Sequence, residues 1–217
     1  MKLPDLEDLA FARYLTPHAG ALGLPGDYDT VLFERAEFDA PHAPNAHFLE
    51  CAFRTVTITD GALQRSSLRG VWARDLRLTA TSLAEGSWTD VTVLGSVLAG
   101  VELFGAQLRD VVFSGCKLDS VNFRAARLTG VVFDNCVLRD CDFAGAALTR
   151  CAFGGSQLTQ ADFSKVVMDG TDLRGAELGL IIDTGSLRGA TISSGQLAVV
   201  APVLAAALGI VVSDGPA

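Results

Sequence analysis

The chain has 217 residues, 49% of them apolar and 19% charged, and this balance allows a substantial core and argues against a disordered protein. Its formal net charge of −8 disfavours non-specific binding to nucleic acid or to an anionic membrane surface. The first ten residues carry Asp5, Glu7 and Asp8, which do not fit a secretory signal, so we expect a cytoplasmic protein.

Residues 1–30 lie outside the pattern that fills most of the chain, and we expect them to form an N-terminal cap and linker. Their apolar residues predict a short helix that covers the first turn of the following domain, because the open end of a stacked fold needs a cover. These apolar residues are Leu6, Leu9, Phe11 and Leu15. The glycines of residues 20–26 predict a linker into that domain.

Residues 31–192 follow a period of five. From Phe33 to Leu178 every fifth residue is apolar, and it is large except at Ala43 and Ala73. Residues five apart lie about 500° apart around an α-helix and on alternate faces of a flat strand, so the period fits neither. It fits a square coil of four five-residue sides, in which the central residue of each side points inwards.

Residues 20 apart should then stack in ladders along the coil, because four sides contain 20 residues. The four predicted ladders run from Phe33 to Leu173, from Phe38 to Leu178, from Leu63 to Phe163 and from Phe48 to Met168. Near the end of the domain Asp183 falls at a central position, and the pattern resumes one residue early at Leu187 and Ile192. We therefore predict a one-residue deletion in the last coil.

Residues 193–217 are expected to form a C-terminal dimerisation helix and tail. The run from Leu197 to Val212 contains no charged residue, but Pro202 interrupts it and it is shorter than the ~20 residues that span a membrane. A helix that is apolar on more than one side must be buried on more than one side. We expect one side to cover the last coil and another to meet a second copy of the chain. The residues expected at this dimer interface are Leu197, Val200, Val203, Leu204 and Leu208.

Catalytic and metal-binding patterns are absent from the sequence. It contains no GxSxG, HExxH or P-loop motif, so we expect no enzyme activity, no metal and no cofactor. The cysteines all take the small inward place of their unit, where free cysteine packs as a small apolar residue. They are Cys51, Cys116, Cys136, Cys141 and Cys151. The histidines, expected in solvated loops, are His18, His42 and His47.

The five-residue units resemble the A(D/N)Lxx consensus of the pentapeptide-repeat family, most clearly at residues 161–163 and 171–173. This resemblance implies an all-β fold, a right-handed quadrilateral parallel β-helix, here with a C-terminal helix. The end of the chain further resembles the helix and tail of the quinolone-resistance pentapeptide proteins. In that subgroup the helix pairs two rods into a dimer, and the rod imitates DNA and binds DNA gyrase or topoisomerase IV. The chain departs from the subgroup in carrying Pro202 within the helix and in having no projecting loop.

One side of the predicted coil carries an acidic excess, and we expect it to bind the partner. Its acidic residues are Glu37, Asp39, Asp60, Asp119, Asp140 and Glu177, and its basic residues are Arg77, Lys117 and Arg139. Duplex DNA of the same ~36 Å length would carry about 21 negative charges, so the charge imitates DNA only in part. Two functions stay open: a DNA-mimicking rod that engages a type II topoisomerase and protects it from inhibitors or modulates it, or a scaffold for another protein. Direct nucleic-acid binding and membrane association are not expected.

Trp72 takes an outward place in its unit. A large apolar side chain at such a place is either a contact for a partner or lies beneath the irregular part of the chain.

Overall fold

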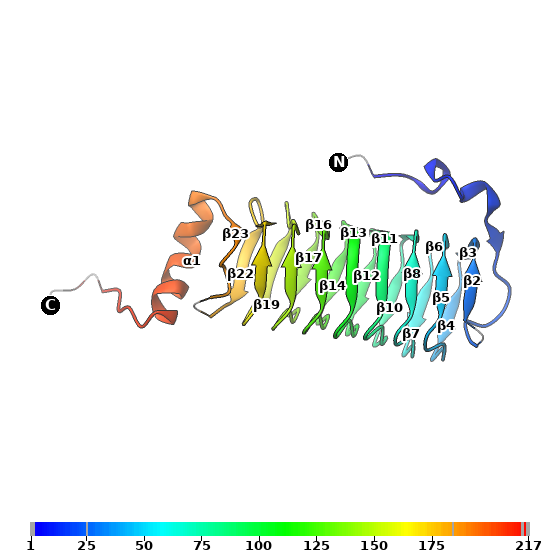
Figure 1. Cartoon of the computed structure of the whole chain (residues 1–217), viewed down its shortest axis with the longest axis horizontal. Coiled ribbons are helices and arrows are strands. Elements are labelled where there is room, and N and C mark those ends of the chain that lie inside the picture. Colours follow the sequence, from blue (N-terminus) through cyan, green and yellow to red (C-terminus); the bar gives the residue numbers. More distant parts are fainter. Residues whose placement is uncertain (1–2, 25, 184, 214, 216–217) are drawn as a thin grey trace.

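The computed structural model describes residues 3–24, 26–183, 185–213 and 215. The chain winds into one straight stack of coils, a right-handed quadrilateral parallel β-helix with a helix at its C-terminal end (Figure 1). Its short strands pair only with the strands of the coils before and after, always in parallel. The fold class predicted from the five-residue period is confirmed.

Two long sheets form most of the walls of the coil. The first contains β1 (Thr16–Pro17), β2 (Asp27–Asp29), β3 (Val31–Glu34), β5 (His47–Leu49), β6 (Ala52–Arg54), β8 (Ser67–Arg69), β9 (Trp72–Arg74), β11 (Ser87–Leu94), β13 (Gln107–Ser114), β15 (Arg127–Thr129), β16 (Val132–Asp134), β18 (Ala147–Thr149) and β20 (Val167–Asp169). The second contains β4 (Glu37–Asp39), β7 (Thr57–Thr59), β10 (Arg77–Thr79), β12 (Val97–Ala99), β14 (Lys117–Asp119), β17 (Val137–Arg139), β19 (Gln157–Asp162) and β22 (Glu177–Ile181).

The remaining elements lie at the two ends. A short pair joins β21 (Thr171–Asp172) to β23 (Ala190–Thr191), and the helices are the 3₁₀ turns η1 (Leu6–Asp8) and η2 (Ala12–Tyr14) and the α-helix α1 (Ser194–Ala207). Among the described residues no helix is long and apolar enough to span a membrane.

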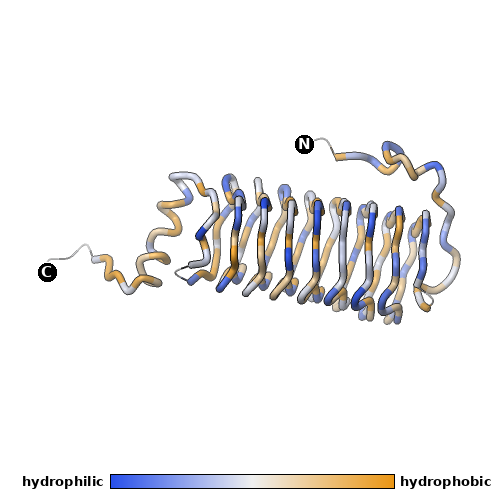
Figure 2. Tube along the Cα trace, in the orientation of Figure 1, coloured by the Kyte–Doolittle hydropathy of each residue, from blue (hydrophilic) through white to orange (hydrophobic). Residues whose placement is uncertain are grey.

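The strand register confirms the predicted ladders. Leu98 pairs with Leu118 and Leu118 with Leu138, each one coil of 20 residues further on. Inside the coil the phenylalanines stack: the rings of Phe113 and Phe133 lie 5.1 Å apart at 5° between their planes. Figure 2 shows how apolar and polar residues alternate along each coil as the side chains point in and out. The core is therefore a continuous apolar column along the axis of the rod.

The corners of the coil are turned by the last residue of each unit. This residue adopts a positive φ, for example 52° at Asp60 and 61° at Gly100. Glycine, asparagine and aspartate adopt this left-handed conformation at the lowest cost. The corner position is exposed at Asp60 and Asp140, so each coil presents its corner side chains to solvent.

The one-residue deletion near the C-terminal end is also confirmed. Ala161 pairs with Leu180, and Thr171 pairs with Ala190, both 19 residues away. The residue is lost at a corner after Gly179, where the register shifts. Ile182 then packs against the core in place of Asp183, whose carboxylate accepts a 2.8 Å hydrogen bond from the backbone N–H of Lys165.

The small side chain of Ala73 leaves a cavity of about 40 Å³ in the core, lined entirely by apolar side chains. We expect Ala73→Val to raise the free energy of unfolding by up to about 1 kcal/mol, since an empty cavity costs about 24 cal/mol per Å³. Urea denaturation would measure the change. Ala43→Val is the matched control, because Ala43 also stands at a central position but does not line this cavity. The interpretation fails if Ala73→Val destabilises the chain as much as Ala43→Val.

The N-terminal residues do not lie where the sequence analysis placed them. Residues 3–15, with η1 and η2, fold back along the outside of the first coils instead of covering the first coil, so the predicted capping helix is wrong (Figure 1). The cover is made by the following segment, in which Leu22 is buried and the His18 ring lies 4.6 Å from that of Phe33. His18 is thus a packed residue and not the predicted solvated one. The stack also begins earlier, because Tyr28 of β2 stacks on Phe48 at 4.9 Å.

Helix α1 covers the other end of the stack. Ser193 and Gln196 form a capping box at its start. The side-chain amide of Gln196 also donates hydrogen bonds to the carbonyl oxygens of Leu173 and Ala176, at 2.6 and 2.7 Å. Val200 is 3% exposed and packs on the core, with Leu204 partly buried beside it. The helix therefore hydrogen-bonds carbonyl groups of the last coil that would otherwise be left at an open sheet end.

Candidate functional site

The six acidic residues predicted to bind a partner lie on the sheet from β4 to β22 or on its corners. Glu37 and Asp39 are on β4, Asp119 is on β14 and Glu177 is on β22, while Asp60 and Asp140 turn corners after β7 and β17. We call this side of the rod the acidic face. Strands β10 and β12 contribute no carboxylate to it, so the acidic residues form two groups separated along the rod.

Basic residues neutralise part of the acidic face. The guanidinium group of Arg139, one coil away, donates a hydrogen bond to the carboxylate of Asp119 and lowers the pKa of that carboxyl group. Lys117 neighbours Asp119 on the same strand. The other five carboxylates form no ion pair with the described residues, and all five are exposed. Asp119 therefore adds less charge to the face than the other five do.

Other sides of the rod carry ion pairs that link neighbouring coils or stay within one unit. Arg54 lies 2.7 Å from Glu34 one coil away, and Arg124 lies 3.0 Å from Asp142. Arg174 pairs with Asp172 at 2.7 Å, and this pair lowers the pKa of Asp172 to about 2. Exposed pairs of this kind contribute little to stability, but they leave these sides with a mixed charge.

All five cysteines are free and buried, as the sequence predicted. Burial raises the pKa of Cys51 and Cys151 to about 11 and that of Cys141 to about 12. The hydrogen bond with Cys116 and burial together hold the pKa of Cys136 well above its ordinary range. The nucleophile in cysteine chemistry is the thiolate, so these thiols are packing groups.

The five residues predicted for a dimer interface, four on α1 and Leu208 at its C-cap, differ in burial. Val200 and Leu204 face the end of the solenoid and hold the helix to its own chain. Leu197, Val203 and Leu208 are 52%, 43% and 63% exposed. The exposed apolar surface extends to Val199 and into the tail, at Ile210, Val211 and Val212.

The sequence analysis missed one surface, the strip of the first sheet that residues 3–15 cover. Trp72, left open as a partner contact or a covered residue, is 2% exposed there. The outward place of Trp72 was the sign of this surface that the sequence offered, and Leu32 and Leu94 of the same strip also take outward places of their units.

Residues 95–163 match the family model for the pentapeptide repeat region. This part of the chain is a pentapeptide repeat region. A search of curated proteins finds no matching sequence. Among solved structures, two of trypsin-treated variants of QnrB1, a plasmid-mediated fluoroquinolone resistance protein, are similar. One has a TM-score of 0.67 at 14% identity and covers 92% of this chain and 96% of that chain. The other has a TM-score of 0.54 at 15% identity and covers 89% and 100%.

A third similar structure is HetL from the cyanobacterium Nostoc sp. strain PCC 7120, a pentapeptide-repeat protein involved in heterocyst differentiation regulation. Its TM-score is 0.38 at 19% identity, with 78% of this chain and 90% of that chain covered. The likeness to the two QnrB1 structures, both above a TM-score of 0.5, establishes the fold.

Proposed function

We propose that this pentapeptide-repeat protein is a non-enzymatic binding rod that engages a type II topoisomerase in place of DNA and protects it from, or modulates, its inhibitors. The proposal rests chiefly on the likeness to QnrB1, which spans 92% of this chain and 96% of that one. The straight rod and the helix at its C-terminal end in Figure 1 are the features that the resemblance to the quinolone-resistance subgroup leads us to expect.

The acidic face is the proposed contact with the enzyme. A DNA-binding channel is basic because it must neutralise phosphates, so it attracts carboxylates held on a rod. The exposed and unpaired residues of the face are the ones we assign to this contact: Glu37, Asp39, Asp60, Asp140 and Glu177. Asp119 is the weakest of the six because Arg139 neutralises it.

The same proposal includes a homodimer. Beside the contact with the solenoid, Leu197 and Val203 of α1 and Leu208 at its end keep 52%, 43% and 63% of their surface exposed, and these residues would bury one another across a twofold axis. Apolar patches of this kind mark interaction surfaces in proteins. Val200 and Leu204 contribute by fixing the helix to the rod.

Gyrase supercoiling, with and without a fluoroquinolone, tests the topoisomerase contact. We expect the chain to inhibit supercoiling or to reduce drug-induced cleavage at micromolar concentration. The double variant Asp60→Lys, Asp140→Lys should need at least about tenfold more protein for the same effect, which corresponds to about 1.4 kcal/mol of binding energy. Both residues are exposed corner residues, so the fold should tolerate the change.

The matched control is Asp90→Lys, Asp110→Lys. These two residues also turn corners, with φ of 54° and 53°, and are exposed, but they lie on the side of the rod that β11 and β13 form. The control changes the net charge by the same amount and should keep the effect. If the unmodified chain changes neither supercoiling nor cleavage, the topoisomerase proposal is dropped. If both double variants lose the effect equally, the contact is not on the acidic face.

The second candidate function is a scaffold that docks another protein, with no link to DNA topology. The ion pairs and mixed charge on the other sides of the rod favour it, since duplex DNA carries negative charge on every side. Failure of the gyrase assay in a chain that is dimeric and folded would leave this function as the preferred one.

A further inference from the structure

The first sheet carries an apolar strip on its outer surface, where the side chains of a solenoid normally face water. The strip contains Leu32 on β3, Ala52 on β6, Trp72 on β9 and Leu94 on β11. Ala52 and Trp72 stand at equivalent places one coil apart, because they pair directly in the sheet. This strip is separate from the core inside the coil and from the acidic face.

Residues 3–15, which we call the strap, cover this strip. Leu6 is 6% exposed and packs with Ala52, Trp72 and Leu94. Leu3 and Leu9 pack on the same cluster. A 3₁₀ turn has three residues per turn, so leucines three residues apart point to the same side, towards the strip.

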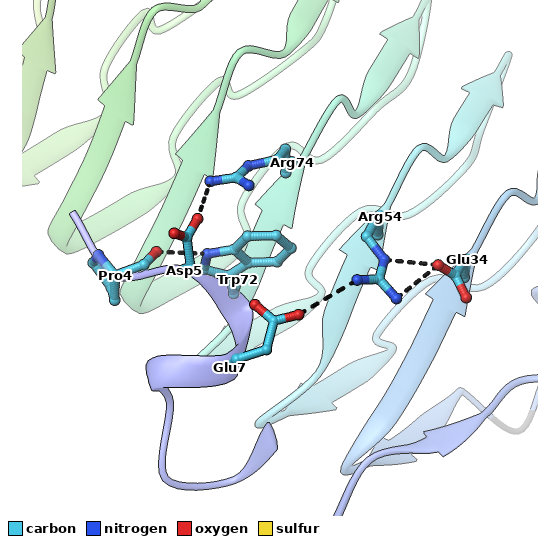
Figure 3. Close-up of polar contacts among 7 residues, drawn as sticks. All are labelled: Pro4, Asp5, Glu7, Glu34, Arg54, Trp72 and Arg74. Atoms are coloured by element: carbon cyan, nitrogen blue, oxygen red, sulfur yellow. Dashed lines mark hydrogen bonds and ion pairs between the residues drawn. The ribbon is translucent and has the colours of Figure 1, made fainter. Parts of the chain in front are cut away.

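Polar contacts on both flanks of the strip fix the position of the strap (Figure 3). The indole N–H of Trp72 donates a hydrogen bond of 3.1 Å to the carbonyl oxygen of Pro4. The guanidinium group of Arg74 lies 2.5 Å from the carboxylate of Asp5 and 5.2 Å from the centre of the Trp72 ring. Arg54, which also pairs with Glu34, lies 3.7 Å from Glu7. The strip thus recognises leucines at its centre and carboxylates at its edge.

The strap is attached by side chains and not by the sheet. The backbone hydrogen bonds found for residues 5–15 stay within the strap, and the first bond from this end of the chain to the solenoid backbone is donated by Thr16 to Thr30. Both ion pairs to the strap are exposed at the surface, where such pairs contribute little. Segments with few buried contacts open at low free energy. The strap can therefore leave the strip while the solenoid stays folded.

The strip has the composition of a peptide-binding site and continues past the strap. A tryptophan flanked by arginines is the typical centre of a protein interface. In the following coils the outward place of Ala52 and Trp72 is taken by Thr92 and then by Val112, Val132 and Ala152, all of them half-buried and uncharged. A bound segment longer than the strap would find further apolar surface there.

We propose that this strip is a binding site for a partner protein's segment that carries leucines three residues apart with carboxylates between them, and that the strap occupies it in the free chain. The partner segment would displace the strap and pair with Arg54 and Arg74. The strap thus acts as an internal competitor that sets the affinity for the partner. The proposal is independent of topoisomerase binding, because it uses another side of the rod.

Trp72 reports the state of the strap in the full-length chain. In a Trp88→Phe background it is the sole tryptophan, and phenylalanine already stands in the same column two coils away, at Phe48. We expect Trp72 emission to be blue-shifted and poorly quenched by acrylamide. Adding Leu6→Asp should undock the strap, shift the emission to the red and raise the quenching constant several-fold.

A synthetic peptide with the sequence of residues 3–15 then tests the site in trans. We expect it to bind the Leu6→Asp variant and to restore the blue-shifted emission, and to fail against the same variant carrying Arg74→Glu. A peptide with Asp5→Arg should bind that Arg74→Glu variant better than the unmodified peptide does. Isothermal titration calorimetry measures the affinity of the peptide for the Leu6→Asp variant directly and does not need the Trp88→Phe substitution.

Two results would overturn the proposal. One is a Trp72 that acrylamide quenches equally with and without Leu6→Asp, since the strap would then not cover it. The other is a peptide that does not bind the Leu6→Asp variant, or that binds it with the same affinity when Arg74 is replaced by Glu, because recognition would then not use the strip.

Discussion

Raising the pH from 9 to 11 is expected to lower the free energy of unfolding by several kcal/mol, through the buried thiols of Cys51, Cys141 and Cys151. Their pKa values rise from an ordinary 9.0 to about 11, 12 and 11 because burial disfavours the thiolate. In the unfolded chain the same thiols release their protons near pH 9. Each thiol therefore stabilises the fold below pH 9 and loses this contribution, by at most about 1.4 kcal/mol per pH unit, as the pH rises towards its folded-state pKa.

The control is a triple variant with valine in place of the three cysteines. Valine already stands at the equivalent place in a neighbouring coil for each of the three. Val121 precedes Cys141 and Val131 precedes Cys151 by one coil, and Val71 follows Cys51 by one coil. The core should therefore accept valine at all three positions. The two proteins differ only at these three positions, so the comparison isolates the effect of the three thiols. Urea denaturation between pH 8 and pH 11 would measure the free energy of unfolding of both proteins as a function of pH. Equal pH dependence in the two proteins would show that the thiols are not its source.

The period of five predicted nearly everything inside the coil. A side chain that points inwards every fifth residue fixes the sheet register, and so the stacking of Phe113 on Phe133, the burial of the cysteines and the deletion near Gly179 followed from counting along the chain. The repeat pattern is enough to predict the contacts inside the coil, because each coil contacts only the coils before and after it.

The same rule could not place the segments that have no period. Trp72 and Pro4 are 68 residues apart and meet through one side-chain hydrogen bond, and no spacing in the sequence connects them. The contact between His18 and Phe33 likewise depends on the tertiary fold, and no spacing in the sequence predicts it. On α1 the residues are apolar all round, so the pattern gave no preferred side and could not separate Val200 from Val203.

Placing a carboxylate at a buried or at an exposed position of α1 is expected to separate its role in covering the last coil from its proposed role in dimerisation. Val200→Asp puts a charge where the side chain is 3% exposed and packs within the hydrophobic core. A buried, unpaired carboxylate costs about 3 kcal/mol or more, so the midpoint of urea denaturation should fall. The cover over the last coil would loosen, and the hydrogen bonds that Gln196 donates would be lost with it.

Val203→Asp is the matched change three residues along, at the edge of the contact with the solenoid, where the side chain is 43% exposed. A surface substitution of this kind changes stability by about 0.5 kcal/mol or less. If the exposed apolar residues of this helix join two copies, light scattering should give twice the 22.7 kDa chain mass for the unmodified protein and the single mass for Val203→Asp. A Val203→Asp chain that stays dimeric would place the interface elsewhere. A Val200→Asp chain as stable as the unmodified one would contradict the covering role of α1, because a carboxylate in that contact cannot be accommodated without cost.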